Sequence, residues 1–211
     1  MFDIPSTGET KWQEYRLQEL IDMGWITYHL DGNHGSDYPR SNEFVESGVP
    51  YISANCIVDG KIDFNNAKYV TEKRADKFRK GVAKNGDVLF AHNATVGPVA
   101  ILETIEPRVI LGTSLTSYRC DNIHIVPKYL RAYLESSRFV RQYEAEMQQT
   151  TRKQVPITTQ RKYTIVVPDM DLQRRISDLV DQSDKSKFEI KKSIENISEL
   201  IKSLMQQDFT N

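Results

Sequence analysis

The 211-residue chain lacks several features that would place it in a special class. It has no apolar run of about 18 or more residues and no basic-then-apolar N-terminus, so we expect neither a membrane span nor a secretory signal, and a cytoplasmic location. Its only two cysteines, Cys56 and Cys120, have no CxxC spacing, which predicts buried free thiols rather than a disulfide or a zinc site. The formal net charge is −1, so any surface for nucleic acid must be local.

Sequence signatures of catalysis are also missing. The chain has no Walker loop, GxGxxG, nucleophile elbow or HExxH motif, and its four histidines are scattered. The parts needed for phosphate binding, hydride transfer and metalloprotease chemistry are therefore lacking. We expect a protein that is not an enzyme, without catalytic residues, bound metal or cofactor.

One nuclease-like pattern provides an alternative. Asp169 is followed by Glu189 and Lys191, in the order of the PD-(D/E)xK enzymes. Those enzymes need the second acid and the lysine on a core strand beside the first acid, so that the carboxylates share a magnesium ion. Here the two residues fall in a predicted helix, about 30 Å along it from Asp169 at 1.5 Å per residue. We therefore interpret the pattern as a coincidence.

Residues 1–168 have the pattern of one globular domain of mixed α and β structure. The apolar spacing of residues 9–23 predicts a helix, and a second helix is predicted over residues 127–149, with Pro127 as its first residue. Short segments separated by Gly, Asn, Asp and Pro predict strands at residues 25–28, 49–53, 87–90, 99–102, 117–120 and 164–167. The sequence thus predicts an α+β fold, in which packed helices cover a small sheet.

Residues 169–211 have the pattern of one long helix that continues beyond the domain. About 40 residues would span about 60 Å, roughly twice the diameter of a small domain. Apolar residues recur at heptad spacing, with a phase change near residues 183–187, which is typical of a coiled coil. The expected dimerisation residues are Ile176, Leu179, Ile190, Ile194, Ile197, Ile201 and Leu204. A helix that lies only on its own domain is the alternative.

Two basic clusters could contact the phosphates of DNA. The first lies within residues 73–84, which contain a single acid, Asp76, and the second within residues 152–162. Lysine and arginine neutralise phosphates whatever the base sequence, so such clusters predict contacts with the DNA backbone. The candidate residues are Lys73, Arg74, Lys77, Lys80, Arg152 and Lys153. A solvated helix face is the alternative for each cluster.

Three polar loops could contact base edges. Recognition of bases uses Asn or Gln for adenine, Arg or Lys for guanine, and short hydroxyls. The loops at residues 33–40, 53–55 and 92–95 offer several of these groups together, and ordinary turn chemistry is the alternative reading. Their candidate residues are Asn33, His34, Ser36, Tyr38, Arg40, Ser53, Asn55, His92, Asn93 and Thr95.

The order of these segments resembles one half of a specificity subunit of type I restriction-modification enzymes. The match spans nearly the whole chain, and the ordered set is more specific than any single piece. It is carried by residues 48–52 (GVPYI), 60–62 (GKI), 85–90 (NGDVLF), 94–97 (ATVG) with 100–102 (AIL), 129–134 (YLRAYL), 150–157 (TTRKQVPI), and 167–168 (VP) with 172–176 (LQRRI).

The resemblance implies a DNA target recognition domain at residues 1–168 and a spacer or dimerisation helix at residues 169–211. The expected partners are double-stranded DNA, separate methyltransferase and restriction subunits, and a second chain paired through the helix, either a copy or another half-subunit. The rival hypotheses are the Asp169 nuclease and a coiled-coil adaptor that binds only protein. Magnesium-dependent cleavage would favour the nuclease, and failure to bind any duplex at low salt would favour the adaptor.

Two departures from the family pattern accompany the resemblance. The family's usual glycine before the Thr95 position is Ala94 here, and Pro98 follows Gly97. Family members also usually hold two recognition domains and two spacer helices, whereas this chain has one of each. The sequence therefore predicts a half-length version.

Overall fold

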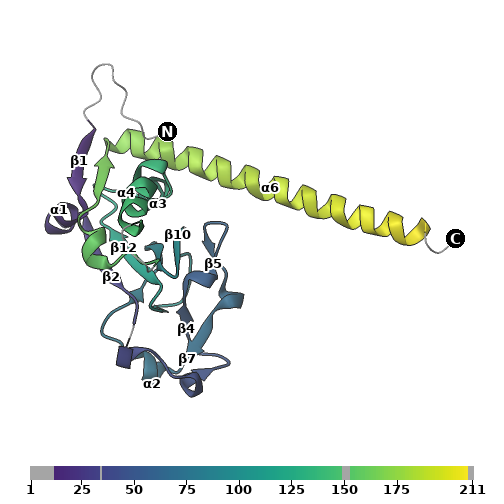
Figure 1. Ribbon diagram of the computed structural model, residues 1–211, viewed down its shortest axis with the longest axis horizontal. Coiled ribbons are helices and arrows are strands. Elements are labelled where there is room, and N and C mark those ends of the chain that lie inside the picture. The colour runs from purple at the N-terminus through teal and green to yellow at the C-terminus, as the bar shows by residue number, and fades with distance from the viewer. Residues whose placement is uncertain (1–11, 34, 149–152, 209–211) are drawn as a thin grey trace.

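The computed structural model describes residues 12–33, 35–148 and 153–208. They form an α+β domain followed by one long helix, α6 (Met170–Asp208), as Figure 1 shows. The predicted fold class is confirmed. Among these residues, no helix is both long and apolar enough to span a bilayer.

Two sheets make the centre of the domain. The four-stranded sheet, in the order β10-β9-β12-β2, contains β2 (Ile26–Asp31), β9 (Val88–Asn93), β10 (Thr95–Ile101) and β12 (Leu115–Cys120), all antiparallel. The five-stranded sheet, in the order β3-β7-β4-β11-β8, contains β3 (Phe44–Val45), β4 (Val49–Ile52), β7 (Lys68–Val70), β8 (Val82–Ala83) and β11 (Val109–Leu111). Its pair β4 and β11 is parallel.

Shorter elements complete the domain. Two further antiparallel pairs are β1 (Gln13–Arg16) with β13 (Thr164–Val167), and β5 (Ile57–Val58) with β6 (Lys61–Ile62). The helices are α1 (Leu17–Asp22), α2 (Glu72–Ala75), α3 (Pro127–Leu134), α4 (Ser137–Met147) and α5 (Ile157–Gln160). Four 3₁₀ helices lie in the loops: η1 (Gly35–Asp37), η2 (Ser41–Glu43), η3 (Ala54–Cys56) and η4 (Phe64–Asn66).

The two faces of the four-stranded sheet belong to different cores. Because side chains alternate along a strand, Phe90 and Leu89 point to opposite faces. Phe90 packs with buried aromatic residues of α3 and α4, including Tyr133 and Phe139. Leu89 packs against the five-stranded sheet, where Leu111 is fully buried. Helices therefore cover one face, and the second sheet covers the other.

Two predicted helices differ from the structure. Within residues 9–23, the described part begins with strand β1, and only Leu17–Asp22 is helical, because residues 13–16 pair with β13. The predicted helix at residues 127–149 is two helices, and the hydroxyl of Ser136 caps the start of α4 by accepting from the backbone N–H of Phe139. The strand predicted at residues 164–167 is confirmed with the same bounds.

Helix α6 packs on the domain only over its first turns. Ile176 is 6% exposed and lies in the core with Tyr129 and Leu130 of α3, so its side chain is not available to a second chain. The side-chain amide of the fully buried Gln173 donates to the backbone oxygens of His124 and Pro168. In Figure 1, α6 then leaves the domain on the side opposite α2.

Candidate nucleic-acid interface

One edge of the four-stranded sheet gathers three of the predicted loops. Strands β2 and β9 end at this edge, and β12 begins there. The segment 112–114 connects the loops, because the Thr113 hydroxyl donates to the Asn33 backbone oxygen (2.8 Å) and the Ala54 N–H donates to the Ser114 hydroxyl (2.8 Å). The His92 N–H donates to the Ser114 backbone oxygen (2.9 Å). Asn33, the 53–55 loop and the 92–95 turn are therefore neighbours.

Gly32 allows two backbone segments at this edge to meet. A Cβ at this position would lie 1.9 Å from the backbone oxygen of Gly112, so no larger residue fits without movement. The N–H of Gly32 donates to the backbone oxygen of Leu115 at 2.9 Å. The absence of a Cβ at Gly32 permits the close approach of the two segments that carry Asn33 and Thr113.

Two of the predicted base-contacting residues lie inside the domain. Asn33 is fully buried, and its side-chain amide donates to the backbone oxygens of Lys80 (3.1 Å) and Leu111 (3.3 Å). His92 is 3% exposed, its Nδ1 lies 3.1 Å from the backbone oxygen of Val155, and burial lowers the pKa of its imidazole. In this conformation both side chains hold the loops together.

Other candidates at this edge reach the surface. Asn55 and Thr95 are exposed, and Ser53 and Asn93 are partly exposed. The side-chain amide of Asn55 donates to the backbone oxygen of Asn66 at 3.3 Å. These four residues offer amides and hydroxyls, the groups that read base edges.

The second basic cluster lies beside the 92–95 turn. Lys153 is exposed, and its backbone oxygen accepts from the N–H of Ala94 at 3.0 Å. Ala94 has φ +64°, a left-handed conformation that costs a residue with a Cβ about 1–2 kcal/mol. The turn thus keeps the shape that a glycine would give it. Arg152 and His34 lie outside the described residues, and Ser36 belongs to η1.

The first basic cluster surrounds α2, at the end of the domain far from α6 (Figure 1). Arg74 forms an ion pair with Glu43 (2.8 Å), donates to the backbone oxygen of Asp37 (2.8 Å) and lies over the Phe78 ring. Arg74 therefore fastens α2 to the 35–43 segment.

The lysines of this cluster differ in their surroundings. Lys80 forms a partly buried ion pair with Asp31, at 2.9 Å between Nζ and Oδ1. Lys73 and Lys77 are exposed, as is Arg79. Lys73, Lys77 and Arg79 are therefore the exposed members on and beside α2 that could meet phosphates, and Lys84 is exposed as well.

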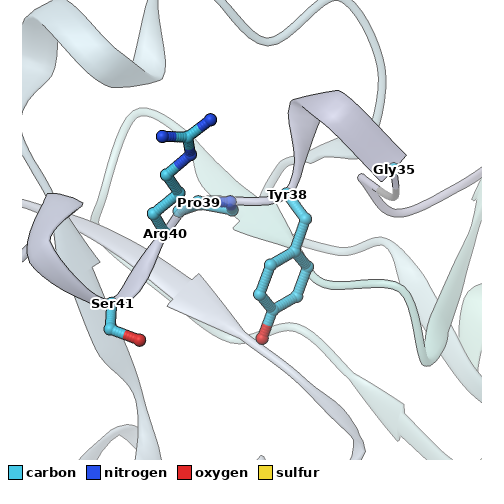
Figure 2. Close-up of a pocket in the computed structure, with 5 residues that line it drawn as sticks. All are labelled: Gly35, Tyr38, Pro39, Arg40 and Ser41. Atoms are coloured by element: carbon cyan, nitrogen blue, oxygen red, sulfur yellow. The ribbon is translucent and has the colours of Figure 1, made fainter.

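A depression lies in the 35–41 loop. Its volume is about 510 Å³, and it is lined by Gly35, Tyr38, Pro39, Arg40 and Ser41. In Figure 2 the Arg40 side chain extends to one side of the loop and the Tyr38 ring to the other. The Tyr38 ring meets the edge of buried Tyr51, with 6.0 Å between centroids, while 43% of Tyr38 stays exposed. The loop therefore presents a guanidinium and a phenol to solvent.

A buried hydrogen-bond network around Gln160, which the sequence did not predict, supports the loops of the candidate interface. Gln160 of α5 donates to the Thr116 hydroxyl (3.0 Å) and the Val155 backbone oxygen (2.9 Å), and its oxygen accepts from the Tyr118 hydroxyl (2.5 Å). The same oxygen lies 3.3 Å from Nε2 of His29, whose pKa is lowered by burial to about 3. The network attaches the segment of Lys153 to the sheet.

The geometry of the nuclease-like residues does not assemble a metal site. The Asp169 carboxylate accepts from the Leu172 N–H at 2.8 Å in the first turn of α6, and Lys191 forms an ion pair with Asp59 (2.7 Å). Within the described residues, no group of three or more His, Cys, Asp or Glu side chains could hold a metal ion. Both cysteines are buried and free, as predicted.

Solved structures share this fold. The chain aligns with a chain from a structure of the complex assembly and conformational transition of the type I R-M system (TM-score 0.65, 20% identity, 91% of this chain and 43% of the other). It aligns similarly with the HsdS subunit from Thermoanaerobacter tengcongensis (TM-score 0.62, 19% identity, 90% of this chain and 42% of the other). The chain therefore shares the fold of the matched part of each of these chains, which is less than half of their length.

Sequence comparison assigns the family. The family model of the type I restriction modification DNA specificity domain matches residues 9–199, and the chain therefore belongs to this family. Curated relatives from Methanocaldococcus jannaschii include the MjaX specificity subunit (26% identity, 94% of this chain and 45% of the relative) and the MjaVIII specificity subunit (21% identity, 90% and 45%). The chain spans about half the length of these relatives, which confirms the resemblance to one half of a specificity subunit.

Proposed function

We propose that the chain is a sequence-specific DNA-recognition subunit of a type I restriction-modification system, which directs separate methyltransferase and restriction subunits to a bipartite target. The family match over residues 9–199 carries this proposal. The exposed amide, hydroxyl and basic groups of the candidate interface support it, since they are the groups that meet bases and phosphates.

We assign different roles to the exposed and buried candidates. Lys73, Lys77 and Lys153 would neutralise phosphates, because each is exposed at an end of the domain where polar loops gather. Arg40 and Asn55 would contact base edges. Asn33 and His92 would act as supports, since burial keeps their side chains from a DNA surface in this conformation.

The dimer is the second part of the proposal. Beyond the domain, the heptad residues Ile190, Ile197 and Leu204 are more than half exposed on α6, and two copies could cover them by pairing. An antiparallel pair would use one self-complementary patch, as a closed two-fold dimer does. Two identical domains would then read inverted copies of one half-site, which makes an interrupted palindrome. Pairing with a different half-subunit would give an asymmetric site instead.

Helix length limits the proposed target. The 39 residues of α6 span about 58 Å at 1.5 Å per residue, which corresponds to roughly 17 base pairs at about 3.4 Å each. Half-site centres should lie no farther apart than this. Methylation sequencing of a host that expresses the chain with its methyltransferase partner would reveal the target directly, and a modified interrupted palindrome is the expected result.

Substitutions separate phosphate contacts from base contacts. Lys73→Ala with Lys77→Ala should weaken binding to every duplex and flatten the salt dependence by about one unit of log K per log salt for each lost contact. Arg40→Ala should cost about 1–3 kcal/mol on the cognate site only. Lys202→Ala and Arg175→Ala, at exposed positions of α6, are the matched controls.

The rival functions predict different results with the pure chain. Cleavage of duplex in magnesium that is lost in Asp169→Ala would support the nuclease. Failure to bind any duplex at low salt, with the dimer intact, would support the coiled-coil adaptor. An unchanged salt dependence of binding in the double lysine variant would show that Lys73 and Lys77 do not contact the DNA backbone.

A further inference from the structure

Helix α6 leaves the domain at a defined residue. Asp184 is the last residue of the helix that is partly buried, and every described side chain from Lys185 to Gln206 is exposed. The direction of α6 at Asp184 therefore decides where the distal helix, and any chain paired with it, lies relative to the domain.

Arg131 of α3 holds Asp184 at this point. The Arg131 side chain is 9% exposed, and its Nη1 donates to Oδ2 of Asp184 at 2.7 Å while Nη2 donates to Oδ1 at 3.4 Å. Its Nε donates to Oε1 of Glu135 at 3.3 Å. A planar guanidinium that binds one carboxylate through two nitrogens fixes orientation as well as distance, which a single point contact does not.

The β5–β6 hairpin closes over the same guanidinium. Its two-residue turn is Asp59-Gly60, with φ +50° and +76°, the Asp-Gly sequence and positive angles of a type I′ turn. A Cβ on Gly60 would lie 2.3 Å from Nη2 of Arg131, so the guanidinium packs on the bare backbone of the turn. Asp59 also reaches Lys191, seven residues beyond Asp184 on α6 (2.7 Å). Figure 1 shows β5 on the side of the domain that faces α6.

We propose that Arg131, Asp184 and Gly60 form a clamp that fixes the direction of α6 and thereby the spacing between the two half-sites that a dimer reads. These three residues are positioning residues, and none needs to touch DNA. The inference rests on the proposed function for its DNA part, whereas its geometric part concerns the isolated protein.

The part of α6 beyond the clamp is long enough for a small change in direction to move its end appreciably. From Asp184 to Asp208 the helix spans about 36 Å at 1.5 Å per residue, so a tilt of about 10° at the clamp displaces its tip by about 6 Å. That displacement equals roughly two base pairs at about 3.4 Å each. A loosened clamp should therefore change the preferred spacing by one or two base pairs.

Gln173 fixes the start of α6 through hydrogen bonds to His124, Pro168 and Val126, eleven residues before Asp184. The contacts of α6 nearer to Asp184 are less directional than the Arg131 fork. Val180 packs against the core as an apolar side chain, and apolar packing sets no unique orientation. The ion pairs Lys128–Asp181 and Lys191–Asp59 are about half exposed or more, so solvent screens them. The Arg131 fork is the most buried ionic contact between α6 and the rest of the domain that the described residues show.

Distance measurements between spin labels test the clamp without DNA. Labels at Glu46→Cys and Ser203→Cys, with an excess of unlabelled chain to isolate distances within one chain, should give one narrow distribution in the wild type. Arg131→Lys, Asp184→Asn and Gly60→Ala should each broaden or shift it. Gly24→Ala is the matched control, since Gly24 has φ +74° and a Cβ there would meet nothing within 4 Å. Asp178→Asn controls for loss of an exposed acid on α6.

Selection from duplexes with variable spacing tests the consequence. The wild type should select one spacing, and the clamp variants should accept spacings that differ by one or two base pairs at an unchanged half-site. Unchanged label distances in folded Arg131→Lys and Asp184→Asn would overturn the clamp, and altered distances with unchanged spacing would overturn its role in target choice. If the wild type selects no duplex, the proposed function fails, while the label distances still decide the clamp.

Discussion

The part of α6 up to Asp184 and the part beyond it carry similar apolar spacing in different surroundings. In the first part, Ile176 is 6% exposed and lies in the core of the domain. In the second part, the equivalent heptad positions Ile190 and Ile197 are 60% and 56% exposed. A heptad pattern therefore identifies an apolar face of a helix, but not whether that face packs on the same chain or on another one.

Polar residues distinguish the two parts more clearly. Gln173 is fully buried, donates to the backbone oxygens of two residues and accepts from the Val126 N–H at 3.0 Å. Such a satisfied buried amide specifies one register for the helix against the domain. Beyond Asp184, the helix has no buried described side chain, so the apolar seam alone must choose its partner.

The largest expected effect comes from charges in the distal seam. Ile190→Glu with Ile197→Glu removes four apolar side chains from a dimer, each worth about 1.5–3 kcal/mol when buried. Sedimentation at micromolar concentration should show a dimer for the wild type and a monomer for this variant, with unchanged urea unfolding of the domain.

The control for this prediction places the same charges on the polar face. Asn196→Glu with Ser203→Glu introduces two carboxylates at exposed sites of the same helix. Each lies one position before a seam residue, Ile197 or Leu204. This variant should remain dimeric. If the wild type sediments as a monomer, the homodimer proposal is wrong. Pairing with another half-subunit would then explain the exposed seam.

The next effect concerns the proximal part. Ile176→Ala should lower the free energy of unfolding of the domain by about 2–5 kcal/mol, because it leaves a cavity in the core. Ile197→Ala, measured at concentrations where the chain is monomeric, should leave that free energy unchanged. Equal losses in the two variants would show that the distal helix also packs on its own domain.

The sequence predicted all four strands of the four-stranded sheet but only β4 of the five-stranded sheet, whose other strands are two or three residues long and carry little local signal. The segments 49–52 and 88–90 are apolar and bounded by turn residues, and both form strands as expected, as does the segment 117–120. Strand β1 was missed because its pairing partner, β13, lies about 150 residues away and no local pattern records that contact. The break between α3 and α4 did have a signal, since Ser136 is a favourable N-cap residue inside a predicted helix.

The candidate interface was predictable in residue type but not in exposure. The segments that carry Asn33, Asn55 and His92 do come together, yet Asn33 and His92 are buried while Asn55 is exposed. An amide or an imidazole suits both a base edge and a buried backbone carbonyl. Tertiary structure decides between these uses, and for Asn33 it is the approach of Lys80 and Leu111 that does so.

Acidification should lower the stability of the domain but leave pairing through the distal part of α6 nearly unchanged. Burial lowers the pKa of His29 from 6.5 to about 3, so folding favours its neutral form. Its contribution to stability is complete above pH 6.5 and is lost as the pH falls toward 3. From pH 6.5 to 5 this costs about 2 kcal/mol, at about 1.4 kcal/mol per unit. His92, whose pKa burial also lowers, changes stability in the same direction.

Urea unfolding at several pH values measures this slope. His29→Phe should make it shallower, because one of the two buried imidazoles is gone. Helix α6 contains no histidine, so dimerisation measured by sedimentation should change little over the same range. A wild-type stability that is flat between pH 6.5 and 5 would contradict the buried neutral state of His29.

The smallest effect is expected where α6 meets the domain through a solvent-exposed ion pair. Lys128 and Asp181 lie 2.6 Å apart, with side chains 45% and 54% exposed. Exposed pairs contribute about 0.2–1 kcal/mol and are weakened by salt, so Asp181→Asn should change the free energy of unfolding by less than about 1 kcal/mol, and by less still at high salt. Asp178→Asn, two turns from the clamp, supplies the control. A loss from Asp181→Asn as large as that from Ile176→Ala would mean that surface charge, rather than apolar burial, holds the proximal helix on its domain.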